Sequence, residues 1–288
     1  MSNLLGNPMK KNLDADTVKS FGDEWSRFDQ TSMSDHEVAK VFAEYFEVFP
    51  WGHLPENAEG FDMGCGSGRW ARCVAGRVGR LHCIDPSEAI EVAKRNLVEY
   101  KNVSFHKASV GEVFAAPCSQ DFGYSLGVLH HVPDTQAAIR SCVEVLKPGA
   151  PLLLYLYYAF DNRPFWFKAL WQISDWCRKL IIRLPARVRH WVTDIIAGMV
   201  YWPISKLSQM LEMLGMSVSS IPLSYYRQHS FYTMRTDARD RFGTPLEHRF
   251  AREQIATMMK TEGLVNLRFS ENAPYWCVVG FKLDRSRD

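Results

Sequence analysis

A glycine-rich turn carries the strongest chemical signal in the sequence, because residues Asp62 to Gly68 read DMGCGSG. Glycines stand at three positions of this turn, Gly64, Gly66 and Gly68. Glycine adopts positive φ angles and lets a ligand approach the backbone closely. The first amides of a helix that follows such a turn lack intrahelical partners and carry partial positive charge. The turn therefore suits a flat, polar, nucleotide-like ligand.

Two acids and one arginine narrow the choice of ligand. A dinucleotide site reads G-x-G-x-x-G, and here Arg69 stands where its third glycine would be. Asp62 would repel a pyrophosphate but suits an ammonium group, and S-adenosylmethionine carries an ammonium, a sulfonium and no phosphate. Asp85 ends a second expected strand and can accept both hydroxyls of a ribose, which fits NAD as well. A carboxylate there could also simply interact with a helix dipole.

The elements that must position this turn alternate between strand and helix patterns. Apolar stretches predict strands over 58–63, 80–85, 103–107, 122–126, 151–157, 264–270 and 275–282. Helices are expected over 69–78, from Pro86 or Ser87 to about 100, from 133 or 134 to 146, and over 253–262. This alternation predicts right-handed βαβ units and a mostly parallel sheet. The short link between the last two strands suits an antiparallel hairpin.

Four motifs in this order carry a resemblance to a known family: DMGCGSG (62–68), DPS (85–87), YSLGVLHHV (124–132) and LKPG (146–149). Together they resemble the class I S-adenosylmethionine-dependent methyltransferases, and more narrowly the small-molecule branch. The motifs lie within 58–157, and residues 250–282 are similar to the closing helix and hairpin of that fold. The resemblance implies an α/β fold with a doubly wound, mostly parallel sheet of seven strands, the last one antiparallel.

The resemblance also implies roles for individual residues around bound S-adenosyl-L-methionine. Asp85 would hold the ribose, and Leu126 and Gly127 would offer carbonyls to the ammonium. Many relatives place an acid at the position of Ser109, so that here the adenine amine would meet a backbone group or the hydroxyl. The other implied contacts are Asp62, Gly64, Cys65, Gly66 and Gly68 at the methionine end, and Pro86, Ser87, Ala108, Ser109 and Val110 around the adenine.

An aromatic stripe marks the N-terminal segment. Phe21, Trp25 and Phe28 fall at i, i+4 and i+7, on one face of an expected helix. The stripe could pack on the main domain, and it could also lay Trp25 over the cofactor as a lid. A second helix is expected over 36–49, capped by Asp35 and ended by a proline.

Methyl transfer to a hydroxyl is helped by a general base. His130 and His131 follow the fourth expected strand and are the candidate catalytic bases, although the pair could instead line the pocket or orient the turn. Candidate acceptor-binding residues farther along the chain are Tyr225, Tyr226, His229 and Tyr232. Asp237, Arg239 and Asp240 are interpreted as an ion-pair network. We find no convincing set of metal ligands.

The long segment after the fifth expected strand is rich in tryptophan and basic residues. Residues 160–215 hold five of the nine tryptophans and eight Lys or Arg against four Asp or Glu, a local charge of +4. Two or three amphipathic helices, broken near Pro185 and Pro203, are expected here, and 216–250 are expected to be irregular. This segment could cap the acceptor, contact a membrane surface peripherally, or form an oligomer interface.

Composition sets the remaining expectations. With 34 basic and 32 acidic residues, nucleic acid is not an expected partner. Seven cysteines without a C-x-x-C pair argue against a zinc site or a disulfide framework, and they fit a cytoplasmic protein, with membrane association as an option. No signal peptide or spanning stretch is apparent. We expect an N-terminal helical lid (1–57), a cofactor-binding core (58–158), an acceptor cap (159–250) and a closing helix and hairpin (251–288).

The sequence thus predicts an S-adenosylmethionine-dependent methyltransferase for a small-molecule, lipid-linked or sugar-linked acceptor, with oxygen as the favoured site. One alternative is an enzyme with the same cofactor and another reaction. A second is a non-catalytic cofactor-binding scaffold protein. The oligomeric state does not follow from the sequence.

Overall fold

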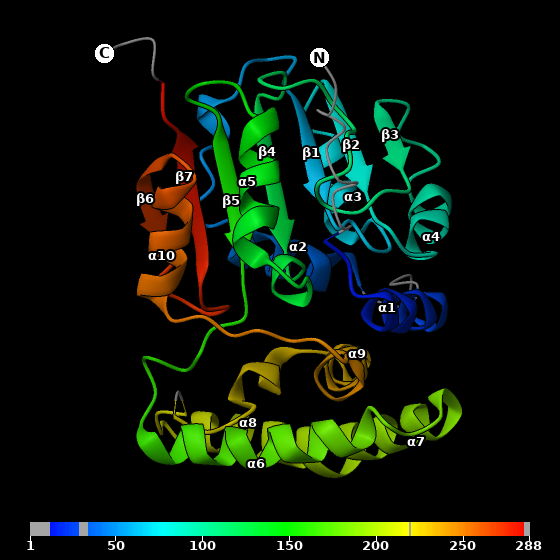
Figure 1. The fold of residues 1–288 in the computed structure, drawn as a ribbon. Coiled ribbons are helices and arrows are strands. Elements are labelled where there is room, and N and C mark those ends of the chain that lie inside the picture. Colours follow the sequence, from blue (N-terminus) through cyan, green and yellow to red (C-terminus); the bar gives the residue numbers. More distant parts are fainter. Residues whose placement is uncertain (1–11, 29–33, 219, 285–288) are drawn as a thin grey trace, which may run out of the picture.

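The computed structural model describes residues 12–28, 34–218 and 220–284, and a single seven-stranded sheet crosses this part of the chain (Figure 1). Its strand order is β3-β2-β1-β4-β5-β7-β6. Only β7 runs antiparallel to its neighbours β5 and β6. The strands are β1 (Glu59–Met63), β2 (Arg80–Ile84), β3 (Val103–His106), β4 (Phe122–Leu126), β5 (Pro151–Tyr155), β6 (Leu264–Phe269) and β7 (Cys277–Lys282). This arrangement confirms the predicted α/β fold; residues 1–11 and 285–288 of the expected terminal segments lie outside the described ranges.

Helices cover both faces of the sheet, as expected for a doubly wound fold. One face packs on α2 (Asp35–Tyr45), α3 (Arg69–Ala75) and α4 (Ala89–Asn96) through a common apolar cluster. The other face packs on α5 (Thr135–Val145) and α10 (Arg252–Thr261). Short 3-10 turns, η1 (Trp51–His53) and η2 (Leu129–His131), complete the core.

Two predicted helix starts are wrong, and local hydrogen bonds explain both. Ser34, not Asp35, caps α2, because its hydroxyl accepts the N–H of Glu37. The helix expected from Pro86 begins only at Ala89. Ser87 is held by its neighbouring acid and accepts the N–H of Ala89, so that residues 86–88 form part of the site loop.

The insertion contains the helices expected over 160–215, with one correction. α6 (Phe165–Ile181) and α7 (Ala186–Ile196) are separated near Pro185, as predicted. No break occurs at Pro203, because α7 continues through the π-helical turn η3 (Ala197–Tyr201) into α8 (Trp202–Met213). A proline in the first turn of a helix segment needs no N–H partner, and the preceding π turn widens the backbone.

The stretch expected to be irregular, 216–250, contains a turn η4 (Ser224–Gln228) and a full helix α9 (Phe231–Gly243). Sequence periodicity fails on α9 because its buried positions include polar residues such as Thr233, Thr236 and Arg239. In Figure 1, α6, α7 and α8 form the lowest layer, and α9 lies between that layer and the core. No helix within the described ranges is long and apolar enough to cross a membrane.

Candidate active site

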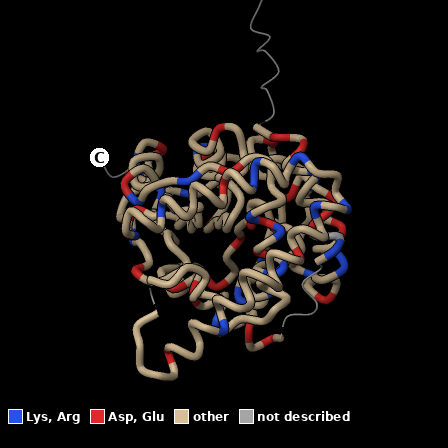
Figure 2. Tube along the Cα trace, turned by 90° about the horizontal axis from the view of Figure 1, so that it is seen from below, with Lys and Arg blue, Asp and Glu red and all other residues tan. Residues whose placement is uncertain are grey.

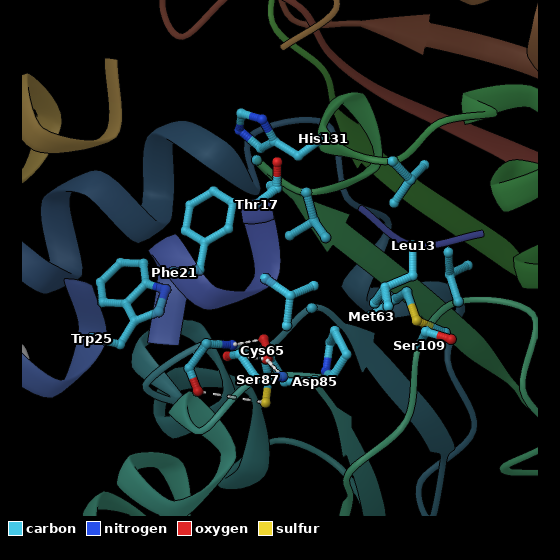
Figure 3. Close-up of a pocket in the computed structure, with 18 of the residues that line it drawn as sticks. Leu13, Thr17, Phe21, Trp25, Met63, Cys65, Asp85, Ser87, Ser109 and His131 are labelled. Carbon is cyan, nitrogen blue, oxygen red and sulfur yellow. Dashed lines mark hydrogen bonds between the residues drawn. The ribbon is translucent and has the colours of Figure 1, made fainter. Parts of the chain in front are cut away.

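A pocket opens at the carboxyl ends of β1, β2 and β4, beneath helix α1 (Ala15–Arg27) (Figure 3). Loops after these strands form its floor, and α1 with the residues before it forms its roof. The roof is tied down at both sides. Asn12 exchanges two hydrogen bonds of 2.7 and 2.9 Å with the backbone of Asp134, and the Ser20 hydroxyl donates to the carbonyl of Gly243 at 3.0 Å. The N-terminal helix is therefore part of the site.

The glycine turn has the backbone that its sequence requires. Gly64, Gly66 and Gly68 adopt φ angles of +83°, +53° and +80°. A Cβ on Gly66 would lie 3.3 Å from the indole of Trp25, which rests directly on this loop. Gly68 begins α3 and packs against Leu97 rather than lining the pocket, since its Cβ would lie 2.8 Å from that side chain.

Asp85 connects the loops after β1 and β2. One carboxylate oxygen accepts the N–H of Gly66 at 3.0 Å. The other accepts the N–H and the hydroxyl of Ser87 at 2.8 and 2.6 Å. Burial raises the pKa of this carboxyl, while these hydrogen bonds act in the opposite direction. The side chain is thus fixed at the pocket wall with its charge compensated by donors of the loops themselves.

Asp62 lies behind the glycine turn and is not among the pocket-lining residues. Its side chain is buried next to Tyr124, its partner across β1 and β4, and its Oδ2 has no hydrogen-bond partner within the described chain. Desolvation raises its pKa to about 8. A buried carboxyl of this kind favours a nearby positive charge.

The residues expected around the adenine lie together in one pocket wall, and their contact with an adenine stays a prediction. Pro86, Ser87, Ala108, Ser109 and Val110 all line the pocket. The backbone N–H and the hydroxyl of Ser109 both donate to the same Glu112 oxygen at 2.7 Å. The acid Glu112 therefore does approach this region, although it stands three residues after Ser109, the position at which many relatives have an acid.

On the methionine side, the pocket wall includes Cys65, Leu126 and Gly127, as expected, and also residues that sequence reasoning missed. The missed residues are Arg69 and Trp70, whose guanidinium and ring lie 4.1 Å apart, and Thr17 and Phe21 of the roof. Arg69 follows the glycine turn directly, and Phe21 belongs to the aromatic stripe, so both were visible as sequence features. Nothing in the sequence marks Thr17.

The two adjacent histidines have different surroundings. His131 lines the pocket, where its ring meets Phe21 at 5.0 Å between ring centroids. Its Nδ1 lies 2.6 Å from the carbonyl of Leu246 and therefore donates a proton to it, while its buried Nε2 has no hydrogen-bond partner among the described residues. His130 is fully buried, and its Nδ1 accepts the N–H of Tyr157. Desolvation lowers the pKa of His130 well below its ordinary value.

The candidate acceptor residues of the insertion lie outside the pocket lining. The Tyr225 hydroxyl donates to Glu44 of α2 at 3.2 Å, and His229 bonds the carbonyl of Tyr225. Tyr226 packs on Tyr201, and Tyr232 packs on Phe28. These four residues join η4 and α9 to the N-terminal helices and the rest of the insertion, and their contact with an acceptor stays a prediction.

The expected ion-pair network of Asp237, Arg239 and Asp240 is wrong. Within the described residues, Arg239 has no hydrogen-bond partner and packs its guanidinium against Gly243. Asp240 instead accepts from the Tyr157 hydroxyl and lies 3.8 Å from Nε2 of His131. The ion-pair network of this region consists of neighbouring residues, Asp175, Arg178, Arg241, Glu247 and Arg249.

The sequence is similar to known methyltransferases. The methyltransferase-domain family matches residues 61–154. A ubiquinone biosynthesis O-methyltransferase of Nitrosomonas europaea is 37% identical over 191 residues, which cover 60% of this chain and 79% of that protein. The enzyme of the same name from Nitrosospira multiformis is 30% identical over 151 residues, 49% of this chain and 61% of the relative. The chain belongs to the class I S-adenosylmethionine-dependent methyltransferases.

A solved structure extends the likeness to the fold as a whole. A chain determined in complex with the Haloferax volcanii Trm112 methyltransferase activator has a TM-score of 0.54 at 12% identity and covers 93% of this chain and 98% of its own. At that identity the likeness concerns the fold alone. The enzyme class thus rests on the sequence relatives.

Proposed function

We propose that this methyltransferase transfers a methyl group from S-adenosylmethionine to a hydroxyl oxygen of a small amphipathic molecule, with an aromatic hydroxyl as the favoured acceptor. The observation that carries the proposal is the position of His131, which lines the cofactor pocket and whose buried Nε2 has no hydrogen-bond partner among the described residues. The names of the relatives, which are O-methyltransferases of ubiquinone biosynthesis, favour the same chemistry.

The pocket fits the cofactor on three counts. Asp85 offers a fixed carboxylate for the ribose hydroxyls, and the Gly66 backbone leaves space that a side chain would fill. Behind the glycine turn, the Asp62 carboxyl has a buried oxygen without a hydrogen-bond partner among the described residues, and an ammonium bound at the methionine end would favour its charged form. When bound, S-adenosylmethionine supplies a methyl group already activated by its sulfonium. The protein then needs to align the acceptor, exclude water and accept a proton.

His131 is placed to accept that proton. Its Nδ1–H donates to the Leu246 carbonyl, which fixes the tautomer and points the basic Nε2 away from that bond. As the acceptor hydroxyl gives up its proton to Nε2, the oxygen becomes the nucleophile for the methyl group. The imidazolium so formed lies 3.8 Å from a carboxylate oxygen of Asp240, which stabilises its charge. Phe21 lines the pocket beside His131 and offers a ring that suits contact with an aromatic acceptor.

The proposal is tested by transfer of labelled methyl from S-adenosylmethionine to a set of phenols and catechols, with matched anilines as nitrogen acceptors. We expect label in the ether products. We further expect His131→Gln to lower kcat by roughly 10²-fold or more with unchanged cofactor affinity. His53→Gln is the control, because His53 is exposed on the turn η1, contacts Phe281 of β7 and does not line the pocket. Transfer to anilines alone, or full turnover in His131→Gln, contradicts the proposal.

A further inference from the structure

The outer surface of α6, α7, η3 and α8 is exceptionally apolar. We call this surface the outer face and define it by the exposed side chains of residues 165–216. Trp176 and Trp191 are 73% and 74% exposed, and Phe165, Met199 and Met213 are 75–85% exposed. Figure 2 views the molecule from this side, which is the lowest layer of Figure 1. Apolar patches of this extent on a folded protein mark an interaction site.

Basic and acidic side chains of the same helices differ in their exposure and in their ion pairs. Every exposed charged side chain of the described residues 165–216 is basic. Four of them, Lys168, Arg183, Arg187 and Lys206, make no ion pair within the described chain; a fifth, Lys179, pairs with Asp175.

The acids of this segment, Asp175, Asp194 and Glu212, all form ion pairs with basic side chains. Asp194 pairs with Arg27 and Arg235, and Glu212 pairs with Arg227. Asp175 is itself buried beside Arg178. The outer face therefore presents apolar and cationic groups together, and each carboxylate of the described residues 165–216 is engaged in an ion pair.

We propose that the outer face docks on the surface of an anionic lipid bilayer. Amphipathic helices with tryptophan on the apolar side and Lys or Arg beside it lie in the plane of a membrane interface. The helices of the outer face have this composition, and none of the described helices can span the bilayer. The tryptophans enter the headgroup region, and the cations pair with lipid phosphates. The inference does not rest on the proposed reaction, because docking requires neither cofactor nor acceptor.

A second copy of the chain fits this surface less well than a bilayer does. A twofold interface brings the same patch of both subunits together. Such an interface would place two sets of unpaired cations, Lys168, Arg183, Arg187 and Lys206, on the same buried surface, whereas the acids of the described residues 165–216 are already engaged in ion pairs. Like charges placed across an interface oppose association. An anionic membrane supplies the missing negative charge over the whole face.

The position of the outer face explains how docking would serve the enzyme. The apolar cluster of Ile181, Ala197, Tyr201, Met234 and Phe242 joins the helices of the outer face to α9. α9 in turn carries Asp240, which lies beside His131 in the active site. Only this one helix layer therefore separates the docking surface from the proposed catalytic residues.

Flotation of the full-length protein with lipid vesicles tests the inference, without cofactor or acceptor present. One set of vesicles contains equal parts phosphatidylcholine and phosphatidylglycerol, and the other contains phosphatidylcholine alone. We expect binding to the anionic vesicles, weakening with salt, and little binding to the neutral ones. Trp176→Ser with Trp191→Ser should weaken binding at least about tenfold. Arg183→Gln with Arg187→Gln should weaken it by roughly 25-fold, at about fivefold per charge.

Matched controls change similar side chains elsewhere. Val98→Ser and Lys101→Gln alter an exposed apolar and an exposed basic residue beside α4, and binding should stay unchanged. Calorimetric binding of S-adenosylmethionine by each variant verifies that it is folded. Absence of binding to anionic vesicles overturns the inference, as does equal binding by wild type and the outer-face variants. A wild-type dimer that the tryptophan variants convert to monomers, without vesicle binding, would instead identify the face as a subunit interface.

Discussion

Replacement of Asp85 by asparagine tests two expected roles of this carboxylate, which are to join the loops after β1 and β2 and to accept the ribose hydroxyls. In the wild type, one oxygen accepts the Gly66 N–H and the other accepts both donors of Ser87. An asparagine keeps one accepting oxygen, so its NH2 group must face either the Gly66 N–H or the donors of Ser87. Loss of a hydrogen bond to a charged group costs about 1.5–3 kcal/mol. Part of this cost is recovered because the neutral amide avoids the burial penalty that raises the pKa of Asp85.

We therefore expect Asp85→Asn to lower the free energy of unfolding by roughly 1–2 kcal/mol. Its affinity for S-adenosylmethionine should fall about 10- to 100-fold, since the loop loses its tie and the ribose loses its acceptor. Urea unfolding and titration calorimetry measure the two effects. Asp121→Asn is the matched control, because Asp121 accepts the Glu59 N–H at 2.9 Å and pairs with Lys147 at the amino ends of the strands, away from the pocket at their carboxyl ends. Wild-type affinity in Asp85→Asn, or an equal loss of affinity in Asp121→Asn, would refute the reasoning.

Further predictions concern the same site. Gly66→Val should abolish cofactor binding measured by calorimetry, because its Cβ would strain the backbone and press on the indole of Trp25; wild-type affinity in this variant would contradict the loop assignment. Trp25→Ala should weaken cofactor affinity without unfolding the core, and an unchanged dissociation constant would show that the indole is not part of the binding surface. Asp62 has a folded-state pKa raised to about 8, so its stabilising contribution is present below the unfolded pKa and is lost as pH rises through 8. In urea unfolding without cofactor, Asp62→Asn should therefore gain roughly 2–4 kcal/mol relative to wild type between pH 5 and pH 8; a difference independent of pH would contradict the burial argument.

The core of the fold could be predicted because its sequence signals are local and strong. Apolar strands alternate with amphipathic helices, and β4 was predicted with its observed ends, Phe122 and Leu126. The insertion was harder to predict. The sequence of α9 shows no clear apolar period because several of its buried side chains are polar. The π-helical turn η3 allows the helix to continue past Pro203, where a proline normally predicts a break.

The candidate site was predictable where backbone conformation requires particular residues, as it does at Gly66, or where a strand ends in an acid, as at Asp85. Contacts between distant segments were not predictable. The approach of Leu246 to His131 joins positions 115 residues apart and selects the tautomer of that histidine. The equal rank of His130 and His131 in the sequence therefore could not be resolved without the fold, and Glu112 was missed because its carboxylate folds back onto Ser109.

The hydrogen-bonded roof over the pocket has a consequence for the order of events in a catalytic cycle. Helix α1 is fastened on one side to the start of α5 through Asn12 and on the other to the end of α9 through Ser20. The Thr17 hydroxyl adds a third tie, since it accepts the Leu246 N–H at 3.1 Å. These hydrogen bonds hold α1 over the cofactor pocket, and an acceptor beside His131 would lie against the same helix. We expect compulsory-order kinetics, in which the methyl donor binds first and the demethylated cofactor departs last.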